Sequence, residues 1–283
     1  MLRLAIQSKG RLNEECASLL QEIGICVDDS KRKFLSKSAN FPLEVLYMRD
    51  DDIPQVVSNG TASLGIVGLN EVEEKGLDVK IEARLGFSAC RISLAIPKAC
   101  EYDGPQYFNG KRIATSYPNI LKKYLEENGI QADIEVIMGS VEIAPAAGIA
   151  DAIFDIVSSG GTLISNGLKE VEKVFFSEAV LISNGKLPAG DRKILEEILF
   201  RIDSVKVSRG QKYILMNLPE AALEDAIKIL PAMRSPTVMP LAAKGWYSMH
   251  SVVSAENLWD KIRQLKAIGA EGILVLTVDK IIP

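Results

Sequence analysis

The chain has 283 residues, of which 47% are hydrophobic and 25% charged, and this composition predicts a globular protein of two or three domains. Its formal net charge of −4 gives a nucleic-acid partner no electrostatic help, so a small anionic substrate would need local positive charge. We expect no signal peptide, because the start (MLRLAIQSKGRL) is too polar, and no apolar run is long enough to span a membrane. The sequence therefore predicts a cytoplasmic protein that binds neither nucleic acid nor membranes.

The cysteines and the single histidine exclude several kinds of site. Cys16, Cys26, Cys90 and Cys100 show no CxxC spacing, so we expect small buried side chains in a reducing compartment. His250 is the only histidine, which nearly excludes histidine-based triads and multi-histidine metal sites. Since it lies in an apolar, strand-like run, we expect it to be structural.

Strands and helices alternate along the first half of the chain. Strands are predicted over residues 2–7, 43–48, 62–67, 92–96, 112–114 and 134–138. Helices are predicted over 13–23, 52–59 and 120–128, with Asn13 as the N-cap of the first and glycines after the ends of all three. This alternation predicts a parallel α/β architecture.

Residues 155–163 (DIVSSGGTL) predict a phosphate-binding loop, because small residues follow an apolar strand. Backbone N–H groups at glycines can approach an anion closely, and hydroxyls add donors. The residues concerned are Ser158, Ser159, Gly160, Gly161 and Thr162. Asp155 would repel phosphate but can accept hydrogen bonds from ribose hydroxyls, so the pattern indicates a ribose 5-phosphate. An ordinary glycine-rich strand-to-helix turn is the alternative, and these residues alone do not decide between the two.

A short internal similarity indicates two lobes. Residues 62–68 (ASLGIVG) resemble 152–158 (AIFDIVS), and each segment reads as a strand that ends in small residues. The simplest explanation is two α/β lobes that present strand ends to a shared cleft, where ligands of such folds bind.

The last part of the chain has a different order of elements. Strands are predicted over 212–218, 237–242, 246–253 and 273–278, and helices over 220–230 and 255–268, the latter capped by Ser254. This βαββαβ order is typical of a ferredoxin-like unit. Because it contains no phosphate-binding loop, we expect a regulatory or assembly module.

Residues 142–163 (EIAPAAGIADAIFDIVSSGGTL) resemble the signature of the long-form ATP phosphoribosyltransferase family along its length. Further matching stretches are 9–12, 49–54, 64–68, 110–118 and 235–237, so the resemblance covers nearly the whole chain. The chain departs from many members at Ser63 and Asn70, where those members carry an acid, and this departure puts ionic or metal roles there in doubt.

The resemblance implies an α/β fold with a two-lobed, periplasmic-binding-protein-like catalytic core and a C-terminal ferredoxin-like regulatory domain. Residues 1–90 and 178–208 would form lobe I, residues 91–177 lobe II, and residues 209–283 the regulatory domain. It implies the condensation of ATP with 5-phosphoribosyl 1-pyrophosphate, which commits ATP to histidine biosynthesis. Mg²⁺ would accompany the substrates, histidine would inhibit, and the chain would assemble into dimers or hexamers.

The resemblance also implies roles for individual residues. The loop at residues 158–162 would hold the 5-phosphate, and Asp155 would hold the ribose hydroxyls. The predicted catalytic residues are Asp155, Arg49 and Lys9. The residues predicted to bind ATP are Arg11, Arg49, Gly68 and Thr115. The residues predicted to bind histidine are Ser235, Thr237 and Gly272, the last of which lies in the turn at 269–272. Taken singly, each cation is more often a solvated surface charge, and Arg49 could pair with an acid in 50–52. The sequence shows no dedicated metal site.

Two other classes compete with the transferase. A two-lobed periplasmic binding protein would share the lobes, but it needs an export signal and does not need a phosphate-binding loop. An amino-acid-sensing regulator would explain the C-terminal module and leave the loop unexplained.

Overall fold

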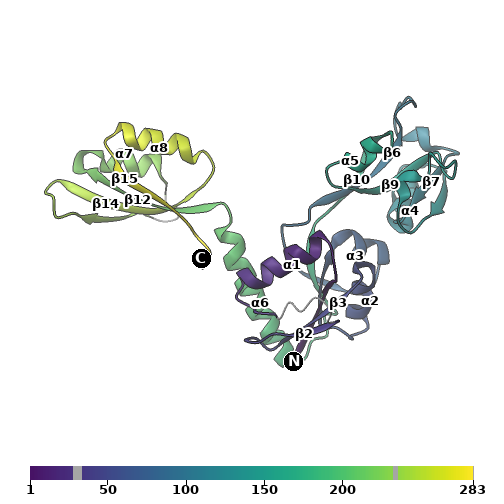
Figure 1. Ribbon diagram of the computed structural model, residues 1–283, viewed down its shortest axis with the longest axis horizontal. Coiled ribbons are helices and arrows are strands. Elements are labelled where there is room, and N and C mark those ends of the chain that lie inside the picture. Colours follow the sequence, from purple (N-terminus) through teal and green to yellow (C-terminus); the bar gives the residue numbers. More distant parts are fainter. Residues whose placement is uncertain (28–33, 232–234, 283) are drawn as a thin grey trace. The chain divides into compact units, whose positions relative to one another are not determined.

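Three β-sheets organise the part of the chain that the computed structural model describes, which is residues 1–27, 34–231 and 235–282. Two sheets lie in one unit, Met1–Glu196, and define what we call the first and the second lobe; the third lies in the other unit, Glu197–Pro283. Helices accompany all three sheets (Figure 1), which confirms the predicted α/β class. The lobe and domain boundaries drawn from the sequence stay predictions.

The first lobe has a six-stranded sheet in the order β2-β3-β1-β4-β11-β5. Its strands are β1 (Leu2–Gln7), β2 (Leu35–Lys37), β3 (Leu43–Met48), β4 (Leu64–Gly68), β5 (Lys80–Arg84) and β11 (Ala179–Ser183). The three central strands β3, β1 and β4 run parallel, whereas β2, β11 and β5 are antiparallel to their neighbours. The parallel strands end at one edge of the sheet, where their following loops meet.

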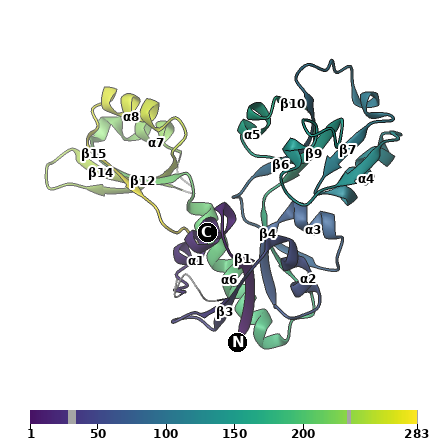
Figure 2. The same ribbon diagram turned by 45° about the vertical axis from the view of Figure 1, so that its right-hand side comes forward.

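Helices cover both faces of this sheet (Figure 2). They are α1 (Arg11–Glu22), the 3-10 turn η1 (Asp50–Asp52), α2 (Ile53–Ser58) and α3 (Leu69–Lys75). Ala5 packs with Ile53 of α2, whereas the next residue, Ile6, faces a pocket beside α1. Because successive strand residues point to opposite faces, α1 and α2 lie on opposite sides of β1.

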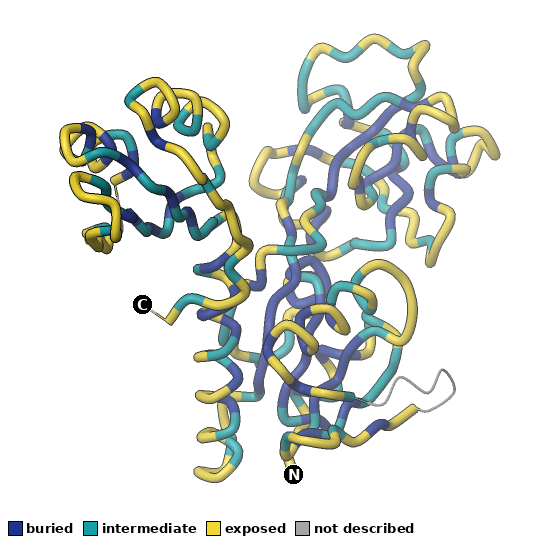
Figure 3. Tube along the Cα trace, turned by 60° about the vertical axis from the view of Figure 1, so that its left-hand side comes forward, coloured by how far each residue is buried: buried dark blue, intermediate teal, exposed yellow. Residues whose placement is uncertain are grey.

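The second lobe has a five-stranded sheet in the order β10-β6-β9-β7-β8. Its elements are β6 (Cys90–Pro97), η2 (Pro105–Phe108), β7 (Arg112–Thr115), α4 (Pro118–Glu127), β8 (Asp133–Val136), η3 (Val141–Ile143), β9 (Ala152–Val157), α5 (Gly161–Ser165) and β10 (Leu168–Ser177). Phe108 and Phe154 are fully buried and join Leu121 of α4 in the core. Figure 3 shows the buried strands of the lobe in dark blue.

The other unit has the predicted βαββαβ order and a four-stranded antiparallel sheet, β13-β14-β12-β15. Its elements are β12 (Gln211–Pro219), η4 (Glu220–Ala222), α7 (Leu223–Ile229), β13 (Thr237–Pro240), β14 (Trp246–Ser254), α8 (Leu258–Ala267) and β15 (Glu271–Thr277). Ile214, Met216 and Met249 pack with Ala226 of α7 and Leu265 of α8. The ferredoxin-like prediction is confirmed. The helix α6 (Ala189–Ser208) contains the boundary between the two units.

Three predictions about local structure were wrong. Helix α1 begins at Arg11, and the Asn13 amide donates to the Gln7 carbonyl oxygen at 2.6 Å instead of capping the helix. Helix α8 begins only at Leu258, and the Ser254 hydroxyl accepts from the Glu256 N–H at 3.1 Å in a turn before it. The sheets are mixed rather than parallel, because strands such as β11 enter without a crossover helix and pair antiparallel.

The cysteines and the membrane prediction have clear outcomes. All four cysteines are free, but only Cys16 is buried; Cys26 is exposed, and Cys90 and Cys100 are partly exposed. The expectation of four buried thiols therefore holds for one of them. Within the described ranges, no helix is both long enough and apolar enough to cross a membrane.

Candidate active site

The predicted phosphate-binding loop follows β9 and leads into the short helix α5. Gly160 has a φ of 82°, a left-handed conformation that favours glycine, and it sits directly before the helix. Ser158, Ser159 and Thr162 are exposed, and the Gly161 N–H points to the Ser159 hydroxyl at 3.5 Å. Since the first N–H groups of a helix have no carbonyl partner within it, this loop offers donors to an anion.

Asp155 lies on β9 just before this loop and is half-buried. Its Oδ1 accepts from the Ile156 N–H at 2.8 Å. Burial raises the pKa of Asp155 to about 6, the nearby Glu142 adds to the rise, and the Ile156 N–H opposes it. The carboxylate is thus ionised at neutral pH, as an acceptor for ribose hydroxyls needs to be.

Arg91 on β6 holds the first residue of the loop, and the sequence analysis missed it. Its Nη1 donates to the Ser158 carbonyl oxygen at 3.2 Å, while its Nε and Nη2 bind the Glu170 carboxylate at 2.5 and 2.6 Å. The Ser93 hydroxyl donates to the same carboxylate at 2.6 Å. The Arg91 hydrogen bonds are the main reason that the pKa of Glu170 is lowered. Arg91 and Glu170 thus form an ion pair between β6 and β10, and this ion pair holds the start of the loop. Arg91 and Glu170 are far apart in the sequence and meet only because β6 pairs with β10, so no local pattern pointed to this role.

An inter-lobe pocket of about 360 Å³ lies at the carboxyl ends of strands from both lobes. The first lobe contributes residues after β3 and β4, and the second contributes residues after β7 and at the end of β8. The lining residues are Arg49, Asp50, Asp51, Glu71, Glu74, Lys75, Ser116, Tyr117, Pro118, Asn119, Val136 and Met138. Such strand ends are where open α/β sheets bind ligands, so this pocket and the loop form the candidate active site.

Tyr117 links the pocket to the loop electrostatically. Its pKa is raised first by burial and then by the charges of Glu71 and Asp155. Asp155 therefore lies within electrostatic range of a residue that lines the inter-lobe pocket. Tyr117 lies in the matching stretch 110–118, but no role was predicted for it, because that role depends on the approach of the first lobe.

The three predicted cations occupy different surroundings. Lys9 is exposed two residues beyond β1, and Arg11 begins α1 with an exposed ion pair to Glu15 at 3.2 Å. Arg49 follows β3, lines the inter-lobe pocket, and makes two hydrogen bonds to Asp51 at 3.1 and 3.2 Å. The ion pair considered as an alternative for Arg49 thus exists, but exposed pairs contribute little stability, so Arg49 can exchange Asp51 for a phosphate.

Gly68 and Thr115, both predicted to contact ATP, are not among the residues that line the inter-lobe pocket. A Cβ at Gly68 would come within 2.3 Å of the Asn70 Oδ1, so glycine there lets Asn70 fold back over the strand end. Thr115 is fully buried at the end of β7, and its hydroxyl accepts from the Tyr117 N–H at 2.8 Å. Thr115 therefore shapes the turn that presents Tyr117, and a direct ATP contact for either residue stays a prediction.

The residues predicted to bind histidine lie on two edges of one sheet. Ser235 and Thr237 are exposed at the start of β13, and Gly272 lies near the start of β15 with a φ of 58°. The sheet order puts β14 and β12 between these edges. His250 on β14 pairs with Thr237, and both of its ring nitrogens have partners, the Tyr213 hydroxyl at 2.8 Å and the Ser248 hydroxyl at 3.0 Å. These bonds fit the structural role expected of His250.

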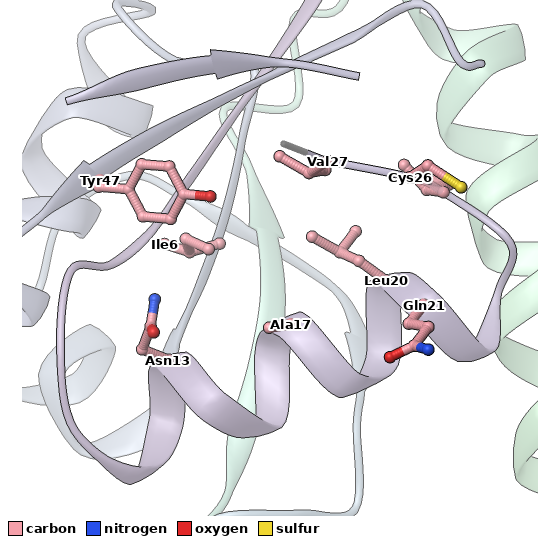
Figure 4. A pocket seen from close by; sticks show the side chains of 9 residues that line it. Ile6, Asn13, Ala17, Leu20, Gln21, Cys26, Val27 and Tyr47 are labelled. Atoms are coloured by element: carbon pink, nitrogen blue, oxygen red, sulfur yellow. The ribbon is translucent and has the colours of Figure 1, made fainter. Parts of the chain in front are cut away.

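A second pocket lies between α1 and strands β1 and β3 (Figure 4). Ile6, Leu20 and Val27 give it an apolar lining, and the Tyr47 side chain points toward it. None of the described residues that line it was predicted as a site residue. Within the described part of the chain, no cluster of three or more His, Cys, Asp or Glu residues could hold a metal ion.

Comparison with known proteins agrees with this geometry. Residues 49–204 match the family described as HisG, ATP phosphoribosyltransferase, and residues 208–280 match the HisG C-terminal domain. A protein named ATP phosphoribosyltransferase from Bacteroides fragilis is 57% identical over 282 residues, covering both chains in full. Another so named, from Cytophaga hutchinsonii, is 54% identical over 282 residues, covering this chain in full and 99% of that one.

Two solved structures show the same architecture. A chain of the ATP phosphoribosyl transferase (HisG:HisZ) complex from Thermotoga maritima aligns with a TM-score of 0.62 and 29% identity, covering 72% of this chain and 96% of that one. The substrate-binding protein of an amino acid ABC transporter aligns with a TM-score of 0.50 and 10% identity over 74% and 94% of the two chains, which shows a shared fold alone. The sequence matches over the full length, together with both domain matches, show that this chain belongs to the ATP phosphoribosyltransferase family, the phosphoribosyl-transferring enzymes of histidine biosynthesis.

Proposed function

We propose that the enzyme condenses ATP with 5-phosphoribosyl 1-pyrophosphate to give 1-(5-phosphoribosyl)-ATP and pyrophosphate. In this reaction the adenine N1 attacks the anomeric carbon C1 of the ribose. The bond from C1 to the pyrophosphate oxygen breaks, and the electron pair leaves with pyrophosphate. The observation that carries the proposal is the loop at 158–162, which follows the half-buried Asp155; that carboxyl group acts electrostatically on Tyr117, which lines the pocket at the strand ends.

The residues at this site suit a transition state with positive charge on the ribose. Such a reaction depends on positioning and charge stabilisation more than on a strong base. The loop would hold the 5-phosphate, and Asp155 would accept hydrogen bonds from the ribose hydroxyls. Lys9, Arg11 and Arg49 would meet the pyrophosphate or the ATP phosphates, because they follow β1 and β3 at the edge where ligands bind.

Magnesium is part of this proposal. Asp50 and Asp51 line the inter-lobe pocket, and their carboxylates could hold the ion together with oxygens of the substrate phosphates. Mg²⁺ often keeps its waters and binds through one or two carboxylates and phosphate oxygens. When bound there, it would neutralise charge on the departing pyrophosphate.

We also propose that histidine inhibits the enzyme through the second unit and that pockets for it form between subunits of a dimer or hexamer. Thr237 and Gly272 lie on opposite edge strands, three strand spacings apart. At about 4.8 Å per spacing this is about 14 Å, too far for one amino acid to reach both on one chain. A neighbouring subunit that brings its β15 beside β13 would complete such a pocket.

The test is incubation with ATP, Mg²⁺ and phosphoribosyl pyrophosphate, followed by the absorbance of the product. Asp155→Ala and Gly160→Val should lower kcat/KM for phosphoribosyl pyrophosphate by about 10²-fold, because each removes a positioning contact. Gly148→Val is the matched control: Gly148 has a similar φ of 72°, lies in open space, and is outside the loop. If both loop variants fold and keep the wild-type kcat/KM, the site assignment is wrong.

A further inference from the structure

Helix α3 carries an unusual set of buried polar residues. Asn70, Glu71 and Glu74 have exposed fractions of 4%, 7% and 7%. Burial of a carboxylate is costly unless it is paired or hydrogen-bonded, so each of these side chains needs an explanation in its surroundings.

Glu74 is explained by the contact between the lobes. Its carboxylate accepts from the Asn119 N–H at 2.9 and 3.1 Å and from the Ile120 N–H at 3.0 Å, at the start of α4 in the second lobe. The Asn119 amide donates in return to the Glu74 carbonyl oxygen at 2.9 Å. Glu74 thus caps a helix of the opposite lobe.

Glu71 has a different set of partners, all of them side chains. Its Oε1 accepts from the Asn70 amide at 3.0 Å, and its carboxylate is hydrogen-bonded to the Tyr117 hydroxyl of the second lobe. The same Asn70 amide reaches the Tyr117 hydroxyl at 3.3 Å. Asn70 is held in turn by Ser177, whose hydroxyl donates to its Oδ1 at 2.7 Å and accepts from its N–H at 3.0 Å.

These contacts place one carboxyl group between the two lobes and beside the pocket. Glu71 and Tyr117 both line the inter-lobe pocket, and Tyr117 is within electrostatic range of Asp155. Glu74 already supplies a contact that holds the two lobes together. The buried Glu71 therefore calls for a separate role.

We propose that Glu71 is a positioning residue for the transfer reaction, acting through its hydrogen bond to the Tyr117 hydroxyl. This inference rests on the function proposed above. With Glu71 ionised, its carboxylate holds Tyr117 against the first lobe and fixes the part of the pocket wall that Tyr117 forms. With Glu71 neutral, the carboxyl group becomes a donor itself, and Tyr117 loses its charged acceptor.

The charges around Glu71 set the pH at which this change occurs. Burial raises the pKa of Glu71 to about 7, Asp50 and Asp51 add to the rise, and the Tyr117 hydrogen bond and the Lys75 charge oppose it. The groups that face it therefore come from η1, α3 and the segment after β7. The carboxylate form, and with it kcat, should increase as the pH rises through about 7.

The experiment compares Glu71→Gln, Tyr117→Phe and the double variant with wild type, with pH profiles of kcat and KM for both substrates. Glu71→Gln keeps the shape but cannot ionise, so kcat at pH 8 should fall about tenfold while both KM values change little, and the rise near pH 7 should disappear. The double variant should be no slower than the slower single variant, since both remove one interaction. Glu73→Gln, an exposed carboxyl group on the same helix, is the matched control and should keep the wild-type profile.

Three outcomes overturn the proposal. The first is a Glu71→Gln enzyme with the wild-type kcat and the wild-type rise near pH 7. The second is a loss of kcat that follows a lowered melting temperature and returns when the assay is cooled, which would make Glu71 merely structural. The third is a wild-type chain without transferase activity, which refutes the proposed function and this role with it. By contrast, an active wild-type enzyme together with an unaffected Glu71→Gln variant refutes this role alone.

Discussion

Asp155 is a single carboxyl group whose ionisation should control substrate use. Its pKa of about 6 is above the ordinary 3.8 because of burial, so the fraction that can accept ribose hydroxyls grows as the pH rises through about 6. We expect kcat/KM for phosphoribosyl pyrophosphate to rise through this pH in wild type. Asp155→Asn should remove the rise and lower kcat/KM about 10²-fold.

Glu71→Gln separates this ionisation from the one near pH 7. That variant should keep the rise of kcat/KM near pH 6, since Asp155 is untouched. A pH profile of Asp155→Asn that still rises near pH 6 would show that another group titrates there.

Glu71 should also affect stability, with the opposite sign to its effect on rate. Its pKa rises from 4.5 in the unfolded chain to about 7 in the fold, so the folded state holds its proton longer. The contribution is complete below about pH 4.5 and is lost as the pH rises through about 7, a total of about 3 kcal/mol. At pH 8, Glu71→Gln should therefore be more stable than wild type in urea titrations, and the difference should vanish near pH 4.5.

The residues of the site differ in how far the sequence could reveal them. Asp155 and its loop are contiguous, so nine consecutive residues were enough to predict them as a candidate site, although not to exclude an ordinary turn. Glu71 and Tyr117 are 46 positions apart and lie in different lobes, so each looks like an ordinary surface residue until the two lobes meet. For Thr115 the family resemblance implied an ATP contact; the structure buries its hydroxyl, which accepts from the Tyr117 N–H, and the contact with ATP stays a prediction.

At the scale of the element, β4 depends on a glycine that lets α2 approach closely. A Cβ at Gly65 would come within 2.6 Å of Ile53 and 2.9 Å of Val57, both in α2. Gly65→Ala should therefore cost about 1–3 kcal/mol in the free energy of unfolding, measured by the denaturant midpoint. Gly190→Ala in α6 is the control, since nothing lies within 4 Å of its added Cβ, and alanine there should be neutral or slightly stabilising. Equal midpoints for the two variants would contradict the packing argument.

Helices α3 and α4 are joined by the Glu74 carboxylate, and this junction can be tested. The Glu74 carboxylate accepts from two N–H groups, those of Asn119 and Ile120. Glu74→Gln leaves a single oxygen to accept from both and turns an NH₂ group toward one of them, so the free energy of unfolding should fall by about 1–3 kcal/mol. Asn119→Ala keeps the backbone donors and loses only the amide bond to the Glu74 carbonyl oxygen, so it should cost less, about 1 kcal/mol. A larger loss for Asn119→Ala in the same thermal melts would show that the carboxylate is not the main link.

Elements with one simple pattern were predictable, and elements defined by their neighbours were not. The buried strands β1 and β3 read as continuous apolar runs, and their bounds were correct to the residue. Strand β10 was not predicted, since its sequence LKEVEKVFFS alternates irregularly where its register shifts twice against β6. Helix α3 was not predicted either, since a seven-residue helix with buried Asn70, Glu71 and Glu74 lacks an apolar stripe.

At the scale of the whole molecule, the second unit has its own core, and none of its described residues belongs to the candidate active site. Buried residues that include Ile214, Met216 and Leu265 form that core. Its Thr237 hydroxyl is exposed on an edge strand. Edge strands carry unpaired backbone groups that can bind an amino acid or a neighbouring strand. A regulatory role for this unit therefore requires that ligand binding here favours one state of the whole assembly.

Thr237→Ala tests this role without removing the unit. If the Thr237 hydroxyl contacts histidine, its loss should raise the histidine concentration for half-inhibition about tenfold, within the 5–150-fold range of typical allosteric coupling. Turnover without histidine should stay at the wild-type level, because the substituted hydroxyl is remote in sequence from the loop and exposed.

Thr277→Ala is the matched control: it removes another exposed hydroxyl, from the far end of β15, and should leave inhibition unchanged. The measurement is the rate against histidine concentration, with sedimentation to follow the oligomer. Saturating histidine that changes neither the rate nor the oligomer state of wild type would refute the regulatory role, and equal responses of the two variants would remove Thr237 from the binding site.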